Sequence, residues 1–516
     1  MSTQAGAGAL ESRNPATLEP LGSVALTPPQ DAARIVAEVA AVTPLWAQLR
    51  VADRARYLER AAQAVIDEFD DLAASIAAES GRPLAEIAAL ELLAAIDTLQ
   101  WLAHNARRLL SARSSALPRA VHPLKRASAG HAPLGVVAVI GAGSSPFAGL
   151  LVQTGAALLG GNGVVVKPAL RGAQAGGRIA GLLARAGFPE GVVRVVQGGG
   201  PLGGALSGCA GVTHVSFAGS SRTAAEVAAA CAARGASCSL DVAASEAMVV
   251  LADANLDGAV AGAVWAACAG AGQLRGTLQR VYVERGLHEA FGDALAAAVQ
   301  ALTIGDPLDP ATELGPLASA GRLELLEQAI ATACASGATR LTPGEPAPAA
   351  LPGAFCAPIV LSGSAAQLTP LHEFLPGPIV GVTAVASPVE AVALENAAGA
   401  AARGASIWSA DRRHAARIAR ELRARVVWCN DHLVGPVLPR DAADAVAACV
   451  SPKLITWDPP GSRLPWRYPY DATSATALRA LVALHSSRPG DRERALRGGM
   501  PAIARVAGRA LRGSRG

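Results

Sequence analysis

The chain has 516 residues, 51% of them hydrophobic and 17% charged, so it can bury a large core in two or three domains. A net charge of +4 is too small to indicate a nucleic-acid partner. The eight cysteines form no Cys-x-x-Cys pair and have no histidine at metal-ligand spacing, so neither a disulfide framework nor a metal site is predicted. The N-terminus lacks a basic segment followed by an apolar one, so we expect a cytoplasmic protein without a signal peptide.

Three helices are predicted before residue 111. Asp31 can cap a helix that ends near residue 42, and Asp53 stands at the start of a longer one in which apolar residues recur at helical spacing to residue 69. A third helix begins after Pro83 and extends to residue 110. Residues 114–131 contain two prolines and form a polar link.

The middle of the chain holds a run, residues 134–168, in which Lys167 is the first charged residue. Its pattern predicts a strand, a helix and a strand over residues 133–140, 147–159 and 164–166. A membrane span is the alternative, but glycines and Pro146 interrupt the run well short of the ~20 apolar residues that a span needs. The run therefore predicts a right-handed βαβ unit, with Lys167 at the carboxyl end of a strand, where open α/β sheets bind ligands.

Strands and helices continue to alternate after this unit. We expect a helix over residues 174–187, strands over 192–196 and 212–217, and a further helix that begins at Gly219-Ser220. This alternation with short links predicts a doubly wound, dinucleotide-binding domain. A second α/β domain is expected from about residue 247, with a strand over 280–284.

The segments Pro133-Leu-Gly-Val-Val-Ala-Val-Ile140 and Asn162-Gly-Val-Val-Val-Lys-Pro168 resemble the aldehyde dehydrogenase superfamily, and the resemblance extends from Arg13 to about Asp431. It implies an α/β aldehyde dehydrogenase-like fold with a Rossmann-type domain, a second catalytic-type α/β domain and a small arm that reaches a neighbouring subunit. The implied divisions are residues 1–113 with 132–246, residues 247–435, and residues 114–131 with 436–460. A homodimer or homotetramer that uses NAD or NADP is then expected.

The resemblance also assigns a cofactor site. Lys167 would donate to the adenosine ribose, and Gly219-Ser220 would place a helix N-terminus beside the pyrophosphate. Ala224 stands where the family has a second glycine, and Leu170 where it has an acidic residue. Binding is therefore expected to be retained but weakened, with the choice between NAD and NADP left open.

The catalytic nucleophile of the family aligns with Arg275, which follows Gly270-Ala-Gly-Gln-Leu274. A guanidinium stays protonated and has no nucleophilic lone pair. Cys268, the nearest upstream thiol, lies about 10 Å away along a helix and cannot take its place, because a nucleophile must approach the carbonyl within ~3–3.5 Å.

The supporting catalytic positions differ as well. Asp241 aligns with the general base and is one methylene shorter, and Ser144 aligns with the oxyanion asparagine. Ala243 and Ala244 replace two glycines that admit the cofactor, and Phe374 replaces an acidic residue that holds the nicotinamide ribose. We therefore expect an impaired enzyme with no intact catalytic residue. Altered oxidoreductase chemistry, a small anionic ligand bound by Arg275, and a scaffold role are the alternatives.

Residues 461–516 form a basic tail beyond the resemblance. The tail has eleven arginines and three acidic residues, so its net charge is +8, and Trp466-Arg-Tyr-Pro-Tyr470 adds three aromatic residues. Apolar residues recur at helical spacing; they are Leu478, Leu481, Val482, Ile503, Val506 and Leu511. The pattern predicts a solvated tail that packs partly on its own catalytic domain. A basic amphipathic helix that makes peripheral contact with an anionic membrane is the alternative.

Overall fold

The computed structural model describes residues 5–6, 8–118, 125–242, 244–343, 350–371, 374–398, 404–432, 439–458 and 471–512. The chain divides into two compact units: Met1–Leu109 with Pro133–Val450 form unit 1, and Leu110–Ala132 with Ser451–Gly516 form unit 2. Ala243 and the aromatic segment 466–470 lie outside the described residues.

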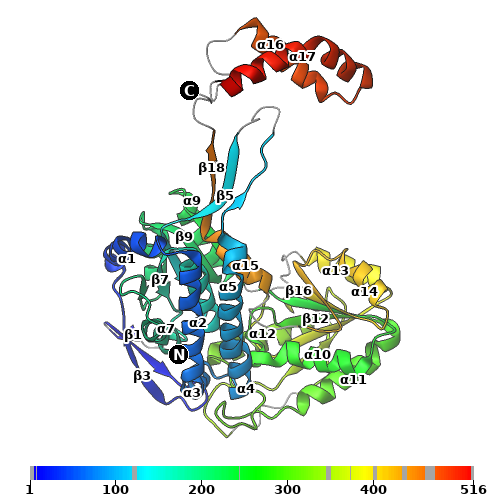
Figure 1. Cartoon of the computed structure of the whole chain (residues 1–516). Helices are drawn as coiled ribbons and strands as arrows, with labels where there is room; N and C mark the ends of the chain where they lie inside the picture. The colour runs from blue at the N-terminus through cyan, green and yellow to red at the C-terminus, as the bar shows by residue number, and fades with distance from the viewer. Residues whose placement is uncertain are drawn as a thin grey trace. The chain divides into compact units, whose positions relative to one another are not determined.

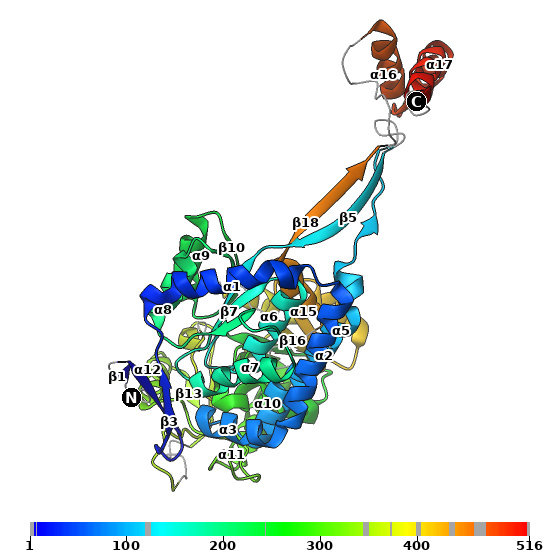
Figure 2. The ribbon, with the colours of Figure 1, turned by 60° about the vertical axis from the view of Figure 1, so that its left-hand side comes forward.

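Unit 1 begins with a small antiparallel sheet and a layer of helices. The strands of this sheet are β1 (Ala5–Gly6), β2 (Ala9–Arg13) and β3 (Pro20–Ala25). The helices are α1 (Ala32–Ala47), α2 (Val51–Asp67), α3 (Phe69–Ser80), α4 (Leu84–Ile87) and α5 (Ala94–Leu110), with a π-helical stretch, Ala88–Leu93, between the last two. Helix α1 packs on the five-stranded sheet that follows, mainly on its strand β7 (Gly163–Lys167) (Figure 2).

Two of the predicted helix boundaries are wrong. Helix α1 continues through Pro44 to residue 47, because Trp46 is fully buried and its indole N–H donates to the carbonyl of Leu158 at 2.9 Å. The second predicted helix is broken at Glu68, whose φ of −110° is not helical and whose carboxylate pairs with Arg178 at 2.8 Å. Both departures come from contacts with distant residues, which the local pattern does not contain.

A five-stranded parallel sheet follows, in the order β10-β9-β6-β7-β8. Its strands are β6 (Val136–Ile140), β7 (Gly163–Lys167), β8 (Val193–Val195), β9 (Val212–Gly219) and β10 (Ser237–Val242). Its helices are α6 (Ala148–Leu159), α7 (Ala173–Arg185), α8 (Gly200–Gly208) and α9 (Ser221–Ala232). From β6 the chain winds first toward β8 and then returns to the other side toward β10, so the order reverses between β6 and β9. The doubly wound arrangement expected from the sequence is confirmed.

A second sheet of seven strands has the order β13-β14-β15-β12-β11-β16-β17 and is parallel except at β13 (Figure 1). Its strands are β11 (Glu246–Val250), β12 (Leu278–Glu284), β13 (Thr339–Arg340), β14 (Ile359–Ser362), β15 (Ile379–Val385), β16 (Gly404–Trp408) and β17 (Val426–Cys429). Its helices are α10 (Leu256–Cys268), α11 (Arg285–Gln300), α12 (Ala320–Ala335), α13 (Pro388–Ala397) and α14 (Arg412–Ala419). A further helix, α15 (Pro439–Ala448), packs on α6 and β10.

The uncharged run at the centre of the chain is core. All five residues of β6 and of β7 are buried, and α6 buries ten of its 12 residues. Among the described residues one helix, Leu84–Leu110, is long and apolar enough to cross a membrane, and α1 and α2 pass the same test only if joined across a 118° bend. Half of the apolar window in Leu84–Leu110 is buried inside the protein, as in an ordinary core helix.

Unit 2 contains a three-stranded sheet and two helices. The strands lie in the order β18 (Val450–Trp457), β5 (Arg126–Pro133) and β4 (Arg113–Ser114). The helices are α16 (Ala472–Leu484) and α17 (Pro489–Arg512), which contain the apolar residues that the sequence places at helical spacing. The expected arm covers residues 436–460, but the structure groups α15 with unit 1 and only the residues after Val450 with unit 2.

Candidate functional site

A cavity of about 420 Å³ lies at the carboxyl edge of the five-stranded sheet. The ends of β6, β9 and β10 line it, from Val139 to Ala142, Ser216 to Ala218 and Ser239 to Val242. The strand order reverses between β6 and β9, and open α/β sheets bind their ligands at such a point. The volume is within the ~300–1,000 Å³ range of small-molecule sites. This cavity is therefore the candidate functional site.

Two of the sequence-predicted catalytic positions meet in this cavity. Arg275 and Asp241 both line it, and the guanidinium of Arg275 forms an ion pair with the carboxylate of Asp241 at the end of β10. The Arg275 side chain is only 8% exposed, whereas that of Asp241 is 39% exposed. The cation at the expected nucleophile position is thus held against the carboxylate at the expected position of the base.

The loop that carries Arg275 has an unusual backbone. Gly270, Ala271 and Gly272 are all left-handed, with φ values of 60°, 51° and 66°. A side chain at Gly272 would overlap the carbonyl group of Gly377, so only glycine fits there. Gln273 fixes the turn from within, because its amide donates to the carbonyl of Gly270 at 3.1 Å.

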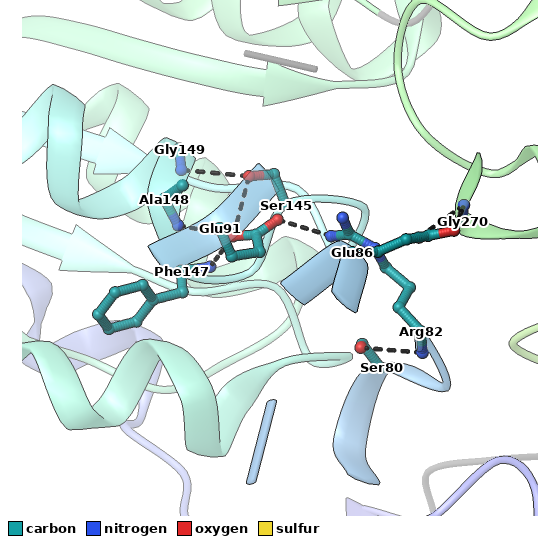
Figure 3. A network of polar contacts seen from close by, with 9 residues as sticks. All are labelled: Ser80, Arg82, Glu86, Glu91, Ser145, Phe147, Ala148, Gly149 and Gly270. Carbon is teal, nitrogen blue, oxygen red and sulfur yellow. Dashed lines mark hydrogen bonds and ion pairs between the residues drawn. The ribbon is translucent and has the colours of Figure 1, made fainter. Parts of the chain in front are cut away.

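A buried polar network, which the sequence analysis missed, holds this loop and the loop after β6 (Figure 3). Arg82 pairs with Glu86 at 3.3 Å and with Glu91 at 2.7 Å. Glu86 accepts from the backbone N–H of Gly270 at 2.9 Å, and Ser145 donates to Glu91 at 3.2 Å. Burial raises the pKa of Glu86. The signal in the sequence was Arg82 just before, and Glu86 and Glu91 within, the third helix predicted after Pro83.

Glu91 also forms the N-terminal anchor of α6. Its carboxylate accepts from the backbone N–H groups of Phe147 at 3.2 Å and of Ala148 at 2.7 Å (Figure 3). These amides have no partner within the helix, so a carboxylate at this point accepts their hydrogen bonds. Its negative charge also interacts favourably with the positive end of the helix dipole. The network thereby joins the start of α6 to the loop before Arg275.

The other predicted catalytic positions lie outside the cavity lining. Ser144 is half-buried in the loop after β6. Its neighbour Ser145 lines the cavity, but Ser144 is not among the described residues that do so. Ala244 and Phe374 are half-buried and likewise absent from that lining. Cys268 is buried at the end of α10, and burial raises the pKa of its thiol to about 12. The thiol therefore stays protonated at neutral pH.

The predicted cofactor residues stand beside the same sheet edge. Lys167, the last residue of β7, is 6% exposed, and its ammonium donates to the carbonyls of Pro168 at 2.9 Å and Gly198 at 2.8 Å. Burial lowers its pKa to about 8. Gly219 ends β9, and the Ser220 hydroxyl caps α9 by accepting from the backbone N–H of Thr223 at 3.3 Å.

These groups fit the adenosine and phosphate part of a dinucleotide. An ammonium has three donors, so Lys167 has one left after its two carbonyl bonds. The N-terminus of α9 offers backbone N–H groups and a positive dipole end, which suit a phosphate. The cavity beyond is open, but the Arg275–Asp241 pair stands in it. The residues therefore fit the adenosine and phosphate end of a dinucleotide, whereas the Arg275–Asp241 pair changes the part of the cavity where the nicotinamide would react.

Further charges line the outer part of the cavity. Arg425 pairs with Asp444 at 2.6 Å and with Asp441 at 3.4 Å, and all three line the cavity. Arg423 lines it too, is exposed, and has no carboxylate partner among the residues that the structure describes. The mouth therefore offers a guanidinium to an anionic group.

Comparison with known proteins gives one consistent result. The model of the aldehyde dehydrogenase family matches residues 2–439. Glutarate-semialdehyde dehydrogenase of Pseudomonas aeruginosa is 33% identical over 384 residues, which are 74% of this chain and 78% of that protein. Betaine aldehyde dehydrogenase 2 of Rhizobium meliloti is 31% identical over 392 residues, 76% of this chain and 79% of that protein.

Solved structures agree. PnpE, solved from Pseudomonas sp. WBC-3, aligns in its complex with nicotinamide adenine dinucleotide with a TM-score of 0.82 and 25% identity over 87% of this chain and 94% of its own. The NAD⁺ complex of an aldehyde dehydrogenase from Bacillus cereus aligns with a TM-score of 0.81 and 25% identity, over 87% of this chain and 93% of its own. The fold expected from the sequence is confirmed.

Proposed function

Because the chain belongs to the aldehyde dehydrogenase family, we propose that it is a catalytically impaired member that keeps a dinucleotide site. The supporting observation is the ion pair of Arg275 and Asp241 in the cavity. By resemblance these residues stand where the family has its nucleophilic thiol and its general base. A guanidinium cannot attack a carbonyl, and a carboxylate paired with it is a weaker base for water.

The proposed site divides into a binding part and an altered part. Lys167, Ser220 and the backbone N–H groups that begin α9 would hold the adenosine ribose and the pyrophosphate. When bound, the nicotinamide would supply a hydride acceptor. Arg275, held by its loop and by Asp241, would keep a positive charge in the cavity instead of a thiolate.

A second candidate is an oxidoreductase that acts on an aldehyde by altered chemistry. The open cavity of about 420 Å³ and the guanidinium of Arg423 at its mouth favour a substrate that carries a carboxylate or phosphate. If neither nucleotide nor substrate binds, a scaffold role is the conclusion. The relatives that match this chain are named as dehydrogenases. An experiment must therefore distinguish an impaired family member from an oxidoreductase with altered chemistry.

Calorimetric titration with NAD and with NADP tests the binding half of the proposal. We expect binding of at least one nucleotide and, in a following screen with glutarate semialdehyde, betaine aldehyde and simple aldehydes, no rise in reduced-nicotinamide absorbance. Arg275→Cys should recover little turnover, since Asp241 is shorter than the family's base. A wild-type turnover that Arg275→Ala abolishes would establish the altered chemistry and refute the impaired enzyme.

We further propose a cytoplasmic homodimer or homotetramer. The assembly is supported by β18, which lies at an edge of its sheet. Its residues Leu454, Ile455 and Trp457 are about half exposed. An apolar edge strand of this kind is suited to pairing with another chain.

A further inference from the structure

The helices α16 and α17 form a hairpin whose contact surface is made of small residues. Only residues 485–488 link them, so they run antiparallel, and both views show them side by side (Figures 1 and 2). The seam buries alanines and glycine from both helices, and a side chain at Gly499 would overlap Ala480. The seam residues are Ala477, Ala480, Ala495, Gly499, Ala502 and Val506.

Several larger apolar side chains of the hairpin are exposed. Val482 is 74% exposed, Leu496 47% and Met500 46%, while Leu478 is half-buried and Ile503 packs, partly buried, against the seam. In a helix pair that is complete in water, large apolar residues fill the seam and polar ones face solvent. In this hairpin the seam is made mostly of small residues and several larger apolar side chains face outward. The hairpin therefore keeps an exposed apolar surface that could pack against a partner.

These side chains gather on one side of the hairpin. Leu478, Leu496, Met500 and Ile503 each follow a seam residue by one position, which is a rotation of about 100° around the helix axis. In two antiparallel helices the same rotation away from the seam points to the same side. Together with Val482 they form a continuous stripe, here called the outer apolar face.

The hairpin also carries uncompensated positive charge. Residues 471–512 contain eight arginines and three acidic residues, a net charge of +5. Each acidic residue pairs with an arginine: Asp491 with Arg494, Glu493 with Arg497, and Asp471 with Arg509.

Four further arginines lack a carboxylate partner within the described part of the chain: Arg479, Arg488, Arg492 and Arg505. Arg479 lies three residues before Val482, and Arg492 four residues before Leu496, so both flank the outer apolar face. The charge and the exposed apolar side chains therefore belong to the same side of the hairpin.

We propose that the outer apolar face docks on an anionic lipid surface. A second copy of the hairpin would bring two net charges of +5 together, whereas anionic headgroups complement the flanking arginines. Helices that lie in a membrane interface combine an apolar stripe with arginines in this way, without spanning the bilayer. The docking is independent of the cavity in unit 1 and of the dinucleotide proposal.

Flotation of the full-length protein with vesicles tests the proposal. At low ionic strength the protein should float with phosphatidylglycerol vesicles and not with phosphatidylcholine vesicles, and high salt should release it. Leu496→Glu with Met500→Glu should abolish flotation. Leu325→Glu with Val389→Glu, which adds the same charge at exposed apolar positions of unit 1, should leave it unchanged.

A charge variant checks the electrostatic part. Arg479→Gln with Arg492→Gln should lower the partition coefficient by about fivefold per arginine, and Arg412→Gln with Arg413→Gln on α14 should not. Absence of flotation at low salt, or equal loss in test and control variants, would overturn the proposal. So would dissociation of an oligomer by Leu496→Glu with Met500→Glu, which would make a second copy the occupant of this face.

Discussion

At the scale of single residues, the reactivity of the cysteines tests whether the protein has an activated nucleophile. Cys268 and Cys356 are buried, and burial raises the pKa of their thiols to about 12 and about 11. Iodoacetamide reacts with thiolates, so both should resist it in the native protein at neutral pH. We expect mass spectrometry to find label on the exposed Cys334 and Cys429 at the slow rate of ordinary thiols.

The denatured protein serves as the control, because all eight cysteines should then react. A thiol that is labelled much faster than free cysteine would show that a nucleophile does exist in the fold. It would then be located by the labelled peptide.

Lys167 provides a second test, through the pH dependence of nucleotide binding. Its pKa is lowered to about 8 by burial, so its ammonium is charged below that pH and loses its charge as the pH rises. Affinity for NAD or NADP should therefore fall between pH 7 and pH 9, by about 1–3 kcal/mol if the charge-assisted hydrogen bond is lost.

Calorimetry with Lys167→Met should show weaker binding at pH 7 that no longer changes with pH. Lys453→Met is the matched control, since Lys453 is an exposed lysine of β18 in unit 2. An unchanged pH profile in Lys167→Met would mean that another group controls the affinity.

At the scale of elements, the buried network around Glu91 is the most sensitive point. Glu91 is 1% exposed and accepts from Arg82, Ser145 and the start of α6. Glu91→Ala would remove one of the two carboxylates that pair with the buried Arg82 and would leave two backbone N–H groups without their acceptor. The loss of stability should be on the order of 3–5 kcal/mol, seen as a fall of several degrees in Tm.

Glu59→Ala, on the exposed face of α2, should change the Tm by no more than a degree or so. Glu91→Gln should fall between the two, because an amide oxygen can still accept from the α6 amides. Equal Tm values for Glu91→Ala and Glu59→Ala would show that the network adds no stability.

The sequence predicted the elements well where periodicity alone decides them. The run 134–168 contains strand, helix and strand as expected, because each segment is buried and bounded by glycine or proline. The prediction failed where distant contacts decide, as at Trp46 and Glu68. It missed the network because Glu86 and Glu91 also bind groups far away in the sequence, at Gly270 and at the start of α6. The meeting of Asp241 with Arg275 followed from the resemblance, whereas their ion pair required the fold.

At the scale of the whole molecule, the edge strand β18 predicts the assembly. Ile455 is 54% exposed on β18, and a charge there should oppose pairing with another chain. We expect light scattering after size exclusion to give a dimer or tetramer for the wild type and a smaller species for Ile455→Lys. Leu325→Lys, on α12, is the control and should leave the mass unchanged. A monomeric wild type would refute the assembly.

The left-handed turn before Arg275 has a consequence for laboratory evolution. Glu86 and Gln273 hold Gly270, and Gly272 fits closely against Gly377, so the backbone of the turn is fixed without help from the side chain at 275. The side chain at position 275 can therefore be substituted while the backbone of the turn keeps its conformation. Arginine and cysteine codons can differ by a single base, so random mutagenesis will often place a cysteine at position 275. Selection for growth on an aldehyde could then reveal which accompanying changes bring back turnover.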